Sequence, residues 1–578
     1  MWPLWHLLLM AASAATAAPA DTGVPYFVVR EVVVWGTPAR DLAQRLPLNY
    51  TWAPVRQPED LLTLPSLSLR DYLGVAGVSL RGSSMEELQT LLEGFPARPA
   101  QSGYLDLNLF PPGFLRAAEV LANPLSAYFG ADAMAGVLNL QVDFRPGVRL
   151  QLDGLGGRGL GLRHSWSLGP TSWLQATAVA YRGPERIEAS DAFDRPMSIT
   201  NLGQRRVAMA ARWLGRTGEV FWTLTGRTGG LPRIPNVSPR RDSLDLWCHL
   251  VGLRLGDWQL SWTLFHTRYR PEVLPRALHR EHQVDLRYRH RWLELRGAVD
   301  LLGSSTVGHR RREALQVAFR DTLHPAGLRL LLGGRLYAST QQRSVVPTAT
   351  LGVGLPGGVY LLWSTGFREP TFNELYWPED PFARGNSDLQ PETSWELEVG
   401  GRWRRGHHRL QGAVFHREVH HLIQWVPVEG RYQPVNASHA SLQGVEASGE
   451  VQGERVFLRA DLQAFWRMQA ARHLIYVPWA HLSLEGGWGP VRLRYRWIGP
   501  RWERPTGPKT LPPVHLVDAH LVTHLGRLQV DIGIHNLLNQ RYQWIRGFPQ
   551  PGRYWILTLN WPWHPTHFPK PLRKGGSS

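Results

Sequence analysis

The stretch Val491-Arg492-Leu493-Arg494-Tyr495-Arg496-Trp497 alternates apolar and charged residues without a break. Because a strand repeats every two residues, this pattern sends the apolar side chains to one face and the arginines to the other. The stretches Val284 to Arg289 and Val456 to Arg467 alternate in the same way. Such runs, separated by Gly, Pro and charged turns, recur from residue 148 onward. The pattern predicts a large antiparallel β architecture.

Strand length and aromatic placement separate a membrane barrel from a soluble sandwich, an alternative that periodicity alone leaves open. Many runs are about 9–11 residues long, which is the length of a tilted strand that crosses a bilayer. Aromatic residues lie near their ends, as at Trp213, Trp258, Trp466 and Trp497, and aromatic rims are typical of membrane barrels. The runs between residues 148 and 561 predict an all-β transmembrane barrel of about 22 antiparallel strands.

Composition excludes several classes. The 578 residues carry 64 Lys and Arg against 47 Asp and Glu, a net charge of +17. After residue 20 there is no run of about 18 apolar residues, which argues against a helical membrane protein. The single Cys248 excludes an intrachain disulfide and a Cys-rich metal site. No recognition helix, zinc spacing or basic heptad accompanies the positive charge, so we expect no nucleic-acid partner.

Charge is divided unevenly along the chain. Residues 21–147 lack the alternating runs and hold nine arginines against thirteen carboxylates, whereas the remainder is strongly basic. An acidic unit beside a basic barrel suggests that one lies inside the other, although two separate domains would show the same division. Charges on a desolvated lumen face need partners, and the alternation assigns to that face Arg287, Arg289, Arg492, Arg494 and Arg496.

The N-terminus predicts export. Residues 1–20 run from an apolar segment into small residues, with Ala-x-Ala patterns ending at Ala14 and Ala20. This is typical of a secretory signal peptide, although the basic residues that usually precede the apolar segment are missing.

Short motifs on both sides of residue 148 carry a resemblance to a known family. In the first part they are Val78 to Gly82, Leu91 to Pro96, Ala118 to Leu121, Ser126 to Gly130 and Gly136 to Leu140. In the second part they are Gly366 to Leu375, Gly385 to Glu392, Gly444 to Glu446, Asn536 to Tyr542 and Pro551 to Arg553. In order and spacing these motifs resemble the plug and barrel signatures of TonB-dependent outer-membrane receptors.

The resemblance implies a fold and a function. The fold is a transmembrane β-barrel with an N-terminal α+β plug domain inside the lumen. The function is the binding of a scarce metal chelate at the cell surface and its import across the bacterial outer membrane with energy relayed by TonB. A corrinoid such as cobalamin is slightly favoured over a ferric siderophore because the plug is compact, although a basic lumen suits an anionic siderophore.

The same resemblance divides the chain and names its partners. We expect a signal peptide at 1–20, a periplasmic segment at 21–36, the plug at 37–147, the barrel at 148–563 and a basic Pro-rich tail at 564–578. The expected partners are TonB, the metal chelate, outer-membrane lipid and a periplasmic binding protein. The metal arrives inside its substrate, so no cofactor is expected.

Two sets of residues are expected to bind the plug to its partners: one to TonB and the other to the barrel wall. The segment Glu31-Val32-Val33-Val34 is β-branched, lacks proline and precedes the plug, so it resembles a TonB box that adds a strand to a partner's sheet edge. An ordinary first plug strand is the alternative. The resemblance also implies two charged latches between plug and barrel, at Arg81-Gly82 and at Glu93-Gly94. A surface Arg and a surface Glu are the alternative.

Ligand contacts are predicted on plug loops 68–77 and 98–104, by resemblance the outward-facing ones. Their hydrogen-bonding, cationic and aromatic side chains suit a contact surface. The predicted contacts on the plug are Tyr72, Arg98, Gln101, Ser102 and Tyr104, and those on the barrel loops are Arg368 and Trp377.

No motif indicates an enzyme. The pairs His407-His408 and His420-His421 point to opposite strand faces and make poor metal ligands. A haem receptor is a weaker alternative, because residues 371–384 contain no histidine between the two barrel motifs. A surface adhesin or ligand-binding barrel that does not transport is the other alternative.

Overall fold

The computed structural model describes residues 50–563, except 56, 65, 191–195, 233–240, 273–274, 342–344, 437–438, 471 and 505. The expected signal peptide, the segment Glu31 to Val34 and the tail at 564–578 lie outside the described residues. Among the helices described, none is both long and apolar enough to cross a membrane.

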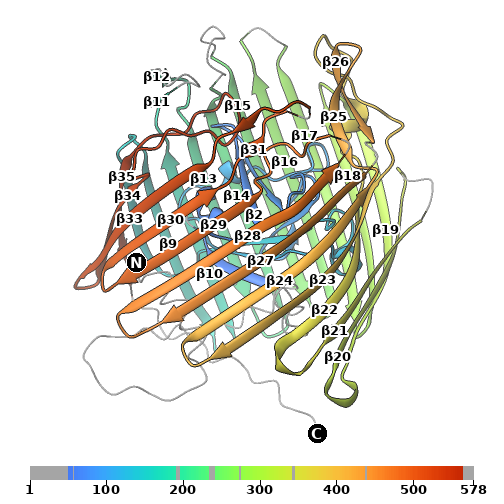
Figure 1. The fold of residues 1–578 in the computed structure, drawn as a ribbon, viewed down its shortest axis with the longest axis horizontal. Coiled ribbons are helices and arrows are strands. Elements are labelled where there is room, and N and C mark those ends of the chain that lie inside the picture. Colours follow the sequence, from blue (N-terminus) through green and yellow to red (C-terminus); the bar gives the residue numbers. More distant parts are fainter. Residues whose placement is uncertain are drawn as a thin grey trace.

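Twenty-two antiparallel strands close into one barrel, which confirms the predicted architecture (Figure 1). Closure is made by β35 and β8, where Asn560 lies opposite Arg149. The barrel strands are β8 Gly147–Asp153, β9 Arg158–Gly169, β10 Ser172–Arg182, β13 Arg205–Leu214, β14 Gly218–Gly230, β15 Ser243–Leu255, β16 Trp258–Arg270, β17 Ala277–His290, β18 Leu293–Ser304, β19 Gly308–Leu323, β20 Arg329–Ser339, β21 Val346–Gly354, β22 Val359–Arg368, β23 Glu392–Arg405, β24 His408–His420, β27 His439–Gln452, β28 Val456–Ala470, β29 Ala480–Trp488, β30 Val491–Ile498, β33 Val514–Leu525, β34 Leu528–His535 and β35 Tyr554–Trp561.

The two ends of the barrel differ. At one end, here the turn end, neighbouring strands are joined by short connections, two of which hold 3-10 turns, η3 Pro325–Gly327 and η4 Pro356–Gly358. At the other, the loop end, long connections carry the helix α4 Phe372–Tyr376 and three hairpins, two of which, β11-β12 and β25-β26, are labelled at the top of Figure 1. The hairpins are β11 Ile187–Ser190 with β12 Pro196–Ile199, β25 Ile423–Val428 with β26 Arg431–Asn436, and β31 Arg501–Trp502 with β32 Thr510–Leu511.

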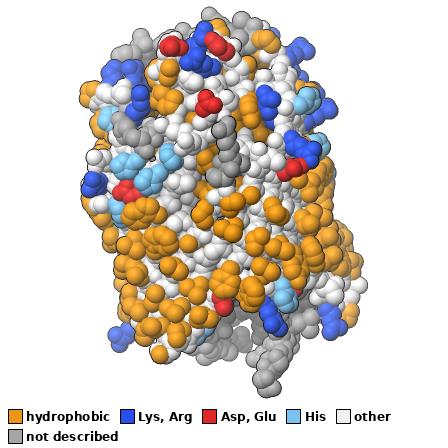
Figure 2. Space-filling view, turned by 90° about the vertical axis from the view of Figure 1, so that its right-hand side faces the viewer, with side chains coloured by type: hydrophobic (Ala, Val, Ile, Leu, Met, Phe, Trp, Pro, Cys, Tyr) orange, Lys and Arg blue, Asp and Glu red, His pale blue; other side chains and the backbone are white. Residues whose placement is uncertain are grey.

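Alternation sets the two faces of the wall as predicted. On β30, Leu493 is 53% exposed on the outer face, while Arg492 and Arg496 are 7% and 4% exposed in the lumen. Figure 2 shows hydrophobic side chains gathered over the lower part of one outer face, with charged groups above them. Exposed tryptophans mark the turn end, at Trp258, Trp292, Trp403, Trp488 and Trp561.

The plug fills the lumen and is α+β, as expected, with little helix. Its five-stranded sheet has the order β1-β6-β7-β4-β5, in which only β4 and β7 pair in parallel. The strands are β1 Tyr50–Pro54, β4 Leu88–Leu92, β5 Phe95–Pro96, β6 Leu115–Leu121 and β7 Gly136–Val142. Beside them lie the hairpin β2 Leu67–Asp71 with β3 Ala76–Leu80, the turns η1 Pro58–Thr63 and η2 Leu107–Leu109, and the helix α3 Ser126–Phe129.

We predict that Leu493→Arg destabilises the barrel in a bilayer by roughly 2–4 kcal/mol, because it places a charge in the apolar outer belt. Leu538→Arg, at a residue that is 62% exposed in a loop-end connection, should cost far less. Urea unfolding in lipid vesicles measures both. Equal losses would contradict the assignment of the outer face.

Candidate functional site between plug and barrel

The end of β3 directs an arginine at the barrel wall. The chain turns at Arg81 and Gly82, which have φ of 49° and 75°. A Cβ on Gly82 would come within 2.8 Å of the Leu442 side chain, so glycine suits this turn in both conformation and space. Holding a non-glycine residue such as Arg81 in this region costs about 1–3 kcal/mol, which the surrounding contacts must exceed.

Arg81 binds three glutamates of the barrel. Its Nη1 lies 2.7 Å from Glu396 Oε1, and its Nη2 lies 2.6 Å from Glu398 Oε2. Its Nε and Nη2 also donate to the two carboxylate oxygens of Glu446, at 3.0 and 2.8 Å. Arg81 is 1% exposed, and its guanidinium lies 4.2 Å from the centre of the Phe415 ring. Burial alone would lower the pKa of Arg81, but the three carboxylates hold that pKa well above its usual range.

Barrel side chains complete this group, which we call the Arg81 cluster. Arg417 Nε donates to Glu396 at 2.8 Å, and the Tyr360 hydroxyl donates to Glu398 at 2.6 Å. The Gln463 amide donates to Glu446 at 2.9 Å. Two arginines thus face three glutamates, and the barrel supplies only one of these cations.

A second turn directs a carboxylate at the opposite wall. Glu93 and Gly94, between β4 and β5, have φ of 52° and 81°, the conformation of a tight hairpin turn. Glu93 forms an ion pair with Arg212 of β13, and its Oε1 accepts from the Val142 backbone N–H at 2.6 Å. Strands β13 and β23 lie ten steps apart in the closed order of 22 strands, so the two ion pairs hold the plug from opposite sides.

The lumen arginines were expected to find their charge partners on the plug, but the plug supplies a carboxylate to only some of them. Arg494 pairs with Asp60 of the plug at 3.3 Å. Arg496 instead pairs with Asp518, a barrel carboxylate, at 2.6 Å, and Arg289 pairs with Glu294 in the same way. A carboxylate on a neighbouring strand is one cross-strand step away, so the barrel satisfies many of its own charges.

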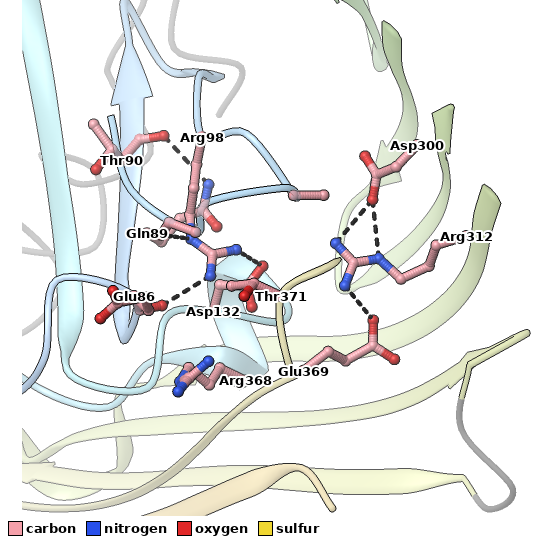
Figure 3. Close-up of polar contacts among 12 residues, drawn as sticks. Glu86, Gln89, Thr90, Arg98, Asp132, Asp300, Arg312, Arg368, Glu369 and Thr371 are labelled. Carbon is pink, nitrogen blue, oxygen red and sulfur yellow. Dashed lines mark hydrogen bonds and ion pairs between the residues drawn. The ribbon is translucent and has the colours of Figure 1, made fainter. Parts of the chain in front are cut away.

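Two arginines predicted to contact a ligand have other partners. Arg98 is 6% exposed; its Nη1 lies 2.6 Å from Asp132, and it donates to the backbone carbonyls of Glu86 and Gly103 (Figure 3). Burial lowers the pKa of Arg98, which Asp132 partly offsets. These contacts argue for a structural role and against the predicted ligand contact.

Arg368 is the other. It is buried at the end of β22 and binds Glu374 of α4 at 3.0 Å and Glu392 of β23 at 2.5 Å. Its guanidinium therefore fixes the start of the long connection that holds α4, and it is not open to a ligand. Figure 3 shows a similar arrangement nearby, where Arg312 lies between Asp300 and Glu369.

Four other predicted contacts meet at one cavity near the loop end. The cavity has a volume of about 210 Å³ and is lined by Gln101, Ser102, Tyr104 and Trp377. Its remaining lining is Val75, Pro99, Leu105, Asp106, Leu109, Leu244, Leu246, Phe265, Thr267, His279, Glu281 and Asn373. Burial raises the pKa of the Tyr104 phenol, so this group is a neutral hydrogen-bonding side chain. Tyr72 is outside this lining and packs edge-on against Phe548, with ring centres 5.3 Å apart.

The plug loop beside the cavity is bound to the barrel. Glu281 of β17 accepts from the backbone N–H groups of Ala100 and Gln101, at 2.5 and 3.0 Å. The backbone N–H groups of Phe372 and Asn373, at the start of α4, donate to the carbonyls of the same two plug residues. Anything that moves this loop therefore also acts on α4.

The glutamates of the Arg81 cluster were not predicted from the sequence. Glu396 and Glu398 of this cluster lie two residues apart on an alternating strand, so the spacing alone places both side chains on one face. Glu392, which binds Arg368, is on the same face. Glu446 lies in the motif Gly444 to Glu446, which was noted without a role. The carboxylates on the predicted lumen face were the feature of the sequence that could have identified these residues.

A closed barrel whose lumen is filled by a domain ion-paired to its walls is a plugged barrel and not an open pore. Comparison with known families gives the same result. The family described as "TonB dependent receptor-like, beta-barrel" matches residues 152–537, and the "TonB-dependent Receptor Plug Domain" matches residues 55–137. The chain belongs to the family of TonB-dependent receptors.

Individual relatives add detail. The vitamin B12 transporter of Vibrio vulnificus is 35% identical over 105 residues, which are 17% of this chain and 16% of that protein. The vitamin B12 transporter of Photobacterium profundum is 36% identical over 91 residues, 14% of each chain. Among solved structures, the siderophore receptor PirA of Acinetobacter baumannii has a TM-score of 0.71 at 12% identity, covering 91% of this chain and 99% of its own. The copper transporter OprC has a TM-score of 0.72 at 14% identity, covering 89% and 99%.

We predict that Arg81→Gln loosens the plug by about 3–5 kcal/mol, because it leaves buried carboxylates without their cation. Arg145→Gln is the matched control, since Arg145 pairs with Asp143 on the plug but its side chain is 45% exposed; it should cost at most about 1 kcal/mol. Hydrogen exchange of plug amides in the intact protein measures both. Unchanged protection in Arg81→Gln would contradict a latch at this turn.

Proposed function

We propose that the protein is a TonB-dependent importer of a metal chelate in the bacterial outer membrane, with a corrinoid as its substrate. The loop end then faces the outside of the cell, and the plug loop 98–104 with α4 forms the base of the binding surface. The chemistry of the cavity carries this proposal. Among the described residues that line it, none is Lys or Arg, and the carboxyl groups are those of Asp106 and Glu281.

That lining favours a corrinoid over an anionic siderophore. A ferric siderophore with net negative charge would meet two carboxylates and no cation in the lining itself, which costs free energy in a partly desolvated site. The nearby Arg227 is already paired with Asp106, at 3.5 Å. A corrinoid offers amides and apolar ring surface, which suit Tyr104, Gln101 and Trp377. The similarity to vitamin B12 transporters over part of the chain supports the same choice.

The cavity would receive only one edge of such a ligand. Its volume of about 210 Å³ is below the roughly 300–1,000 Å³ of sites that enclose a drug-sized molecule. The long connections of the loop end would cover the remainder.

Import needs a way to move a plug held from both sides. The proposed handle is Glu31 to Val34, an extended β-branched segment that would add a strand to a sheet edge of TonB. Arg81 and Glu93 would act as latches that hold the plug until it is pulled. A barrel that only captures ligand or adheres to surfaces would need no such handle, and a haem receptor would need an axial ligand that the cavity, with one histidine, His279, offers only weakly.

We predict that Val33→Pro abolishes uptake and leaves ligand binding to whole cells intact, because proline removes a backbone donor and blocks strand addition. The matched control is Val33→Ile, which keeps the donor and the β propensity. Uptake and surface binding of labelled cobalamin measure both steps. Loss of binding together with uptake would show that the segment is structural.

We predict that Tyr104→Leu weakens cobalamin binding roughly threefold to tenfold, since one aromatic contact contributes about 0.5–1.5 kcal/mol. Tyr288→Leu, on the outer face near the turn end, should leave it unchanged. Binding should vary little between low and high salt, because charge contributes little. Tight binding of an anionic ferric siderophore that falls steeply with salt would overturn the corrinoid assignment. The parallel variant Tyr72→Leu decides whether the contact surface extends beyond the cavity.

A further inference from the structure

A second hollow lies in the barrel wall and is lined mostly by residues of the outer face. It has a volume of about 400 Å³ and lies toward the loop end of β17, β18 and β19. Its lining is Arg280, His282, Leu301, Leu302, Gly303, His309, Arg310 and Arg311. Five of these eight residues are Arg or His. Basic residues are unusual on an outer face that is otherwise mostly apolar.

Strand register explains the hollow. His266, Arg280, Gly303 and His309 lie opposite one another in sequence across four neighbouring strands. Gly303 in the middle of this row has no side chain, so the floor is backbone and its neighbours form the sides. Arg311, opposite Leu301, borders the same floor one step nearer the turn end.

The charge in the hollow is only partly compensated. Arg280 and Arg311 are both exposed. Arg311 pairs with exposed Glu313, whereas no ion pair of Arg280 is found among the residues that the structure describes. Arg310 does not add to the outer charge, because its guanidinium lies 4.1 Å from the centre of the Tyr376 ring on the lumen side.

Apolar side chains continue from the hollow toward the turn end. On β17 the outward residues after His282 are Val284 and Leu286, and on β19 they are Leu315 and Val317, all exposed. Leu301 on β18 joins them. Charged and apolar zones meet in this order on the outer face that Figure 2 shows. A cationic hollow thus lies directly above the apolar belt, at the level where headgroups meet acyl chains.

We propose that this hollow binds the phosphate of a phosphorylated lipid of the outer leaflet, whose acyl chains lie along the apolar belt. Arginine binds phosphate through paired, charge-assisted hydrogen bonds. Arg280 and Arg311 flank the floor at Gly303, and the His309 ring lies 3.7 Å from the position that a Cβ on Gly303 would take. The hollow opens onto the apolar belt, so a lipid headgroup fits it better than free phosphate. This site is separate from the cavity in the lumen, and its place in the outer leaflet rests on the orientation proposed above, in which the loop end faces the outside of the cell.

The test compares lipid binding by the full chain and by the double variant Arg280→Gln with Arg311→Gln. Bisphosphorylated lipid A is titrated against detergent-purified protein, and bound lipid is measured by native mass spectrometry. We expect binding to fall roughly tenfold or more in the double variant, since each basic side chain near a lipid phosphate contributes about fivefold. Arg467→Gln is the matched control, because Arg467 is an exposed arginine near the loop end of β28 that hydrogen-bonds Gln469.

Two further arms separate the sources of the phosphate. Lipid A stripped of its phosphates should bind the unaltered protein as weakly as the intact lipid binds the double variant; equal binding would overturn the proposal in favour of purely apolar contact. Inorganic phosphate at the same concentration should not displace the lipid, and displacement would overturn it in favour of a free-anion site. Both arms use the unaltered protein, so they decide the matter even where the double variant fails to fold. Unchanged binding in a folded double variant would also overturn it.

Discussion

The buried guanidinium of Arg81 is the contact on which the relation between plug and barrel depends. It is the only plug cation among the described partners of Glu396, Glu398 and Glu446, and the barrel's own Arg417 offsets a single carboxylate. Without the plug, three glutamates would face the lumen with one cation between them. Buried ion pairs add little net stability but are expensive to break on one side. The barrel wall is therefore electrostatically complete only when the plug is seated.

The second ion pair works with the first because of where it lies. Glu93 meets Arg212 on a strand almost halfway round the barrel from the Arg81 cluster. Two anchors on opposite walls, together with the ion pair of Asp60 with Arg494, resist rotation of the plug better than one anchor would. Both anchors sit at left-handed turns closed by glycine, and such turns aim a side chain outward from a sheet in a direction that regular strand geometry does not allow. The backbone strain at Arg81 and Glu93 persists because the ion pairs of these two residues hold the turns in place.

The fold could be predicted because strand alternation and turn residues are local properties of the sequence. The alternation at Val491 to Trp497 gave the correct lumen and lipid faces without any knowledge of partners. The site was harder, because a side chain's role depends on what it meets. Arg98 is a residue type suited to binding a ligand, yet its guanidinium already binds Glu86, Gly103 and Asp132. Arg368 likewise meets Glu374 and Glu392 only once the long connection has folded back. Tyr104, Gln101 and Trp377 reach the cavity because their loops are bound to each other, which spacing alone does not reveal.

The order of strands in the plug determines how a pull would reach the two anchors. A force applied N-terminal to Tyr50, as the proposed handle implies, acts first on β1, which is an edge strand paired only with β6. Peeling an edge strand breaks its backbone hydrogen bonds one after another, whereas dragging the whole plug breaks both anchors at once. The Arg81 turn follows β3 and comes next along the chain, and the Glu93 turn follows β4 in the interior of the sheet. Sequential extension would therefore release the Arg81 wall while Glu93 still holds the opposite side. A passage opened on one side only would admit the ligand past a plug that remains attached and able to reseat.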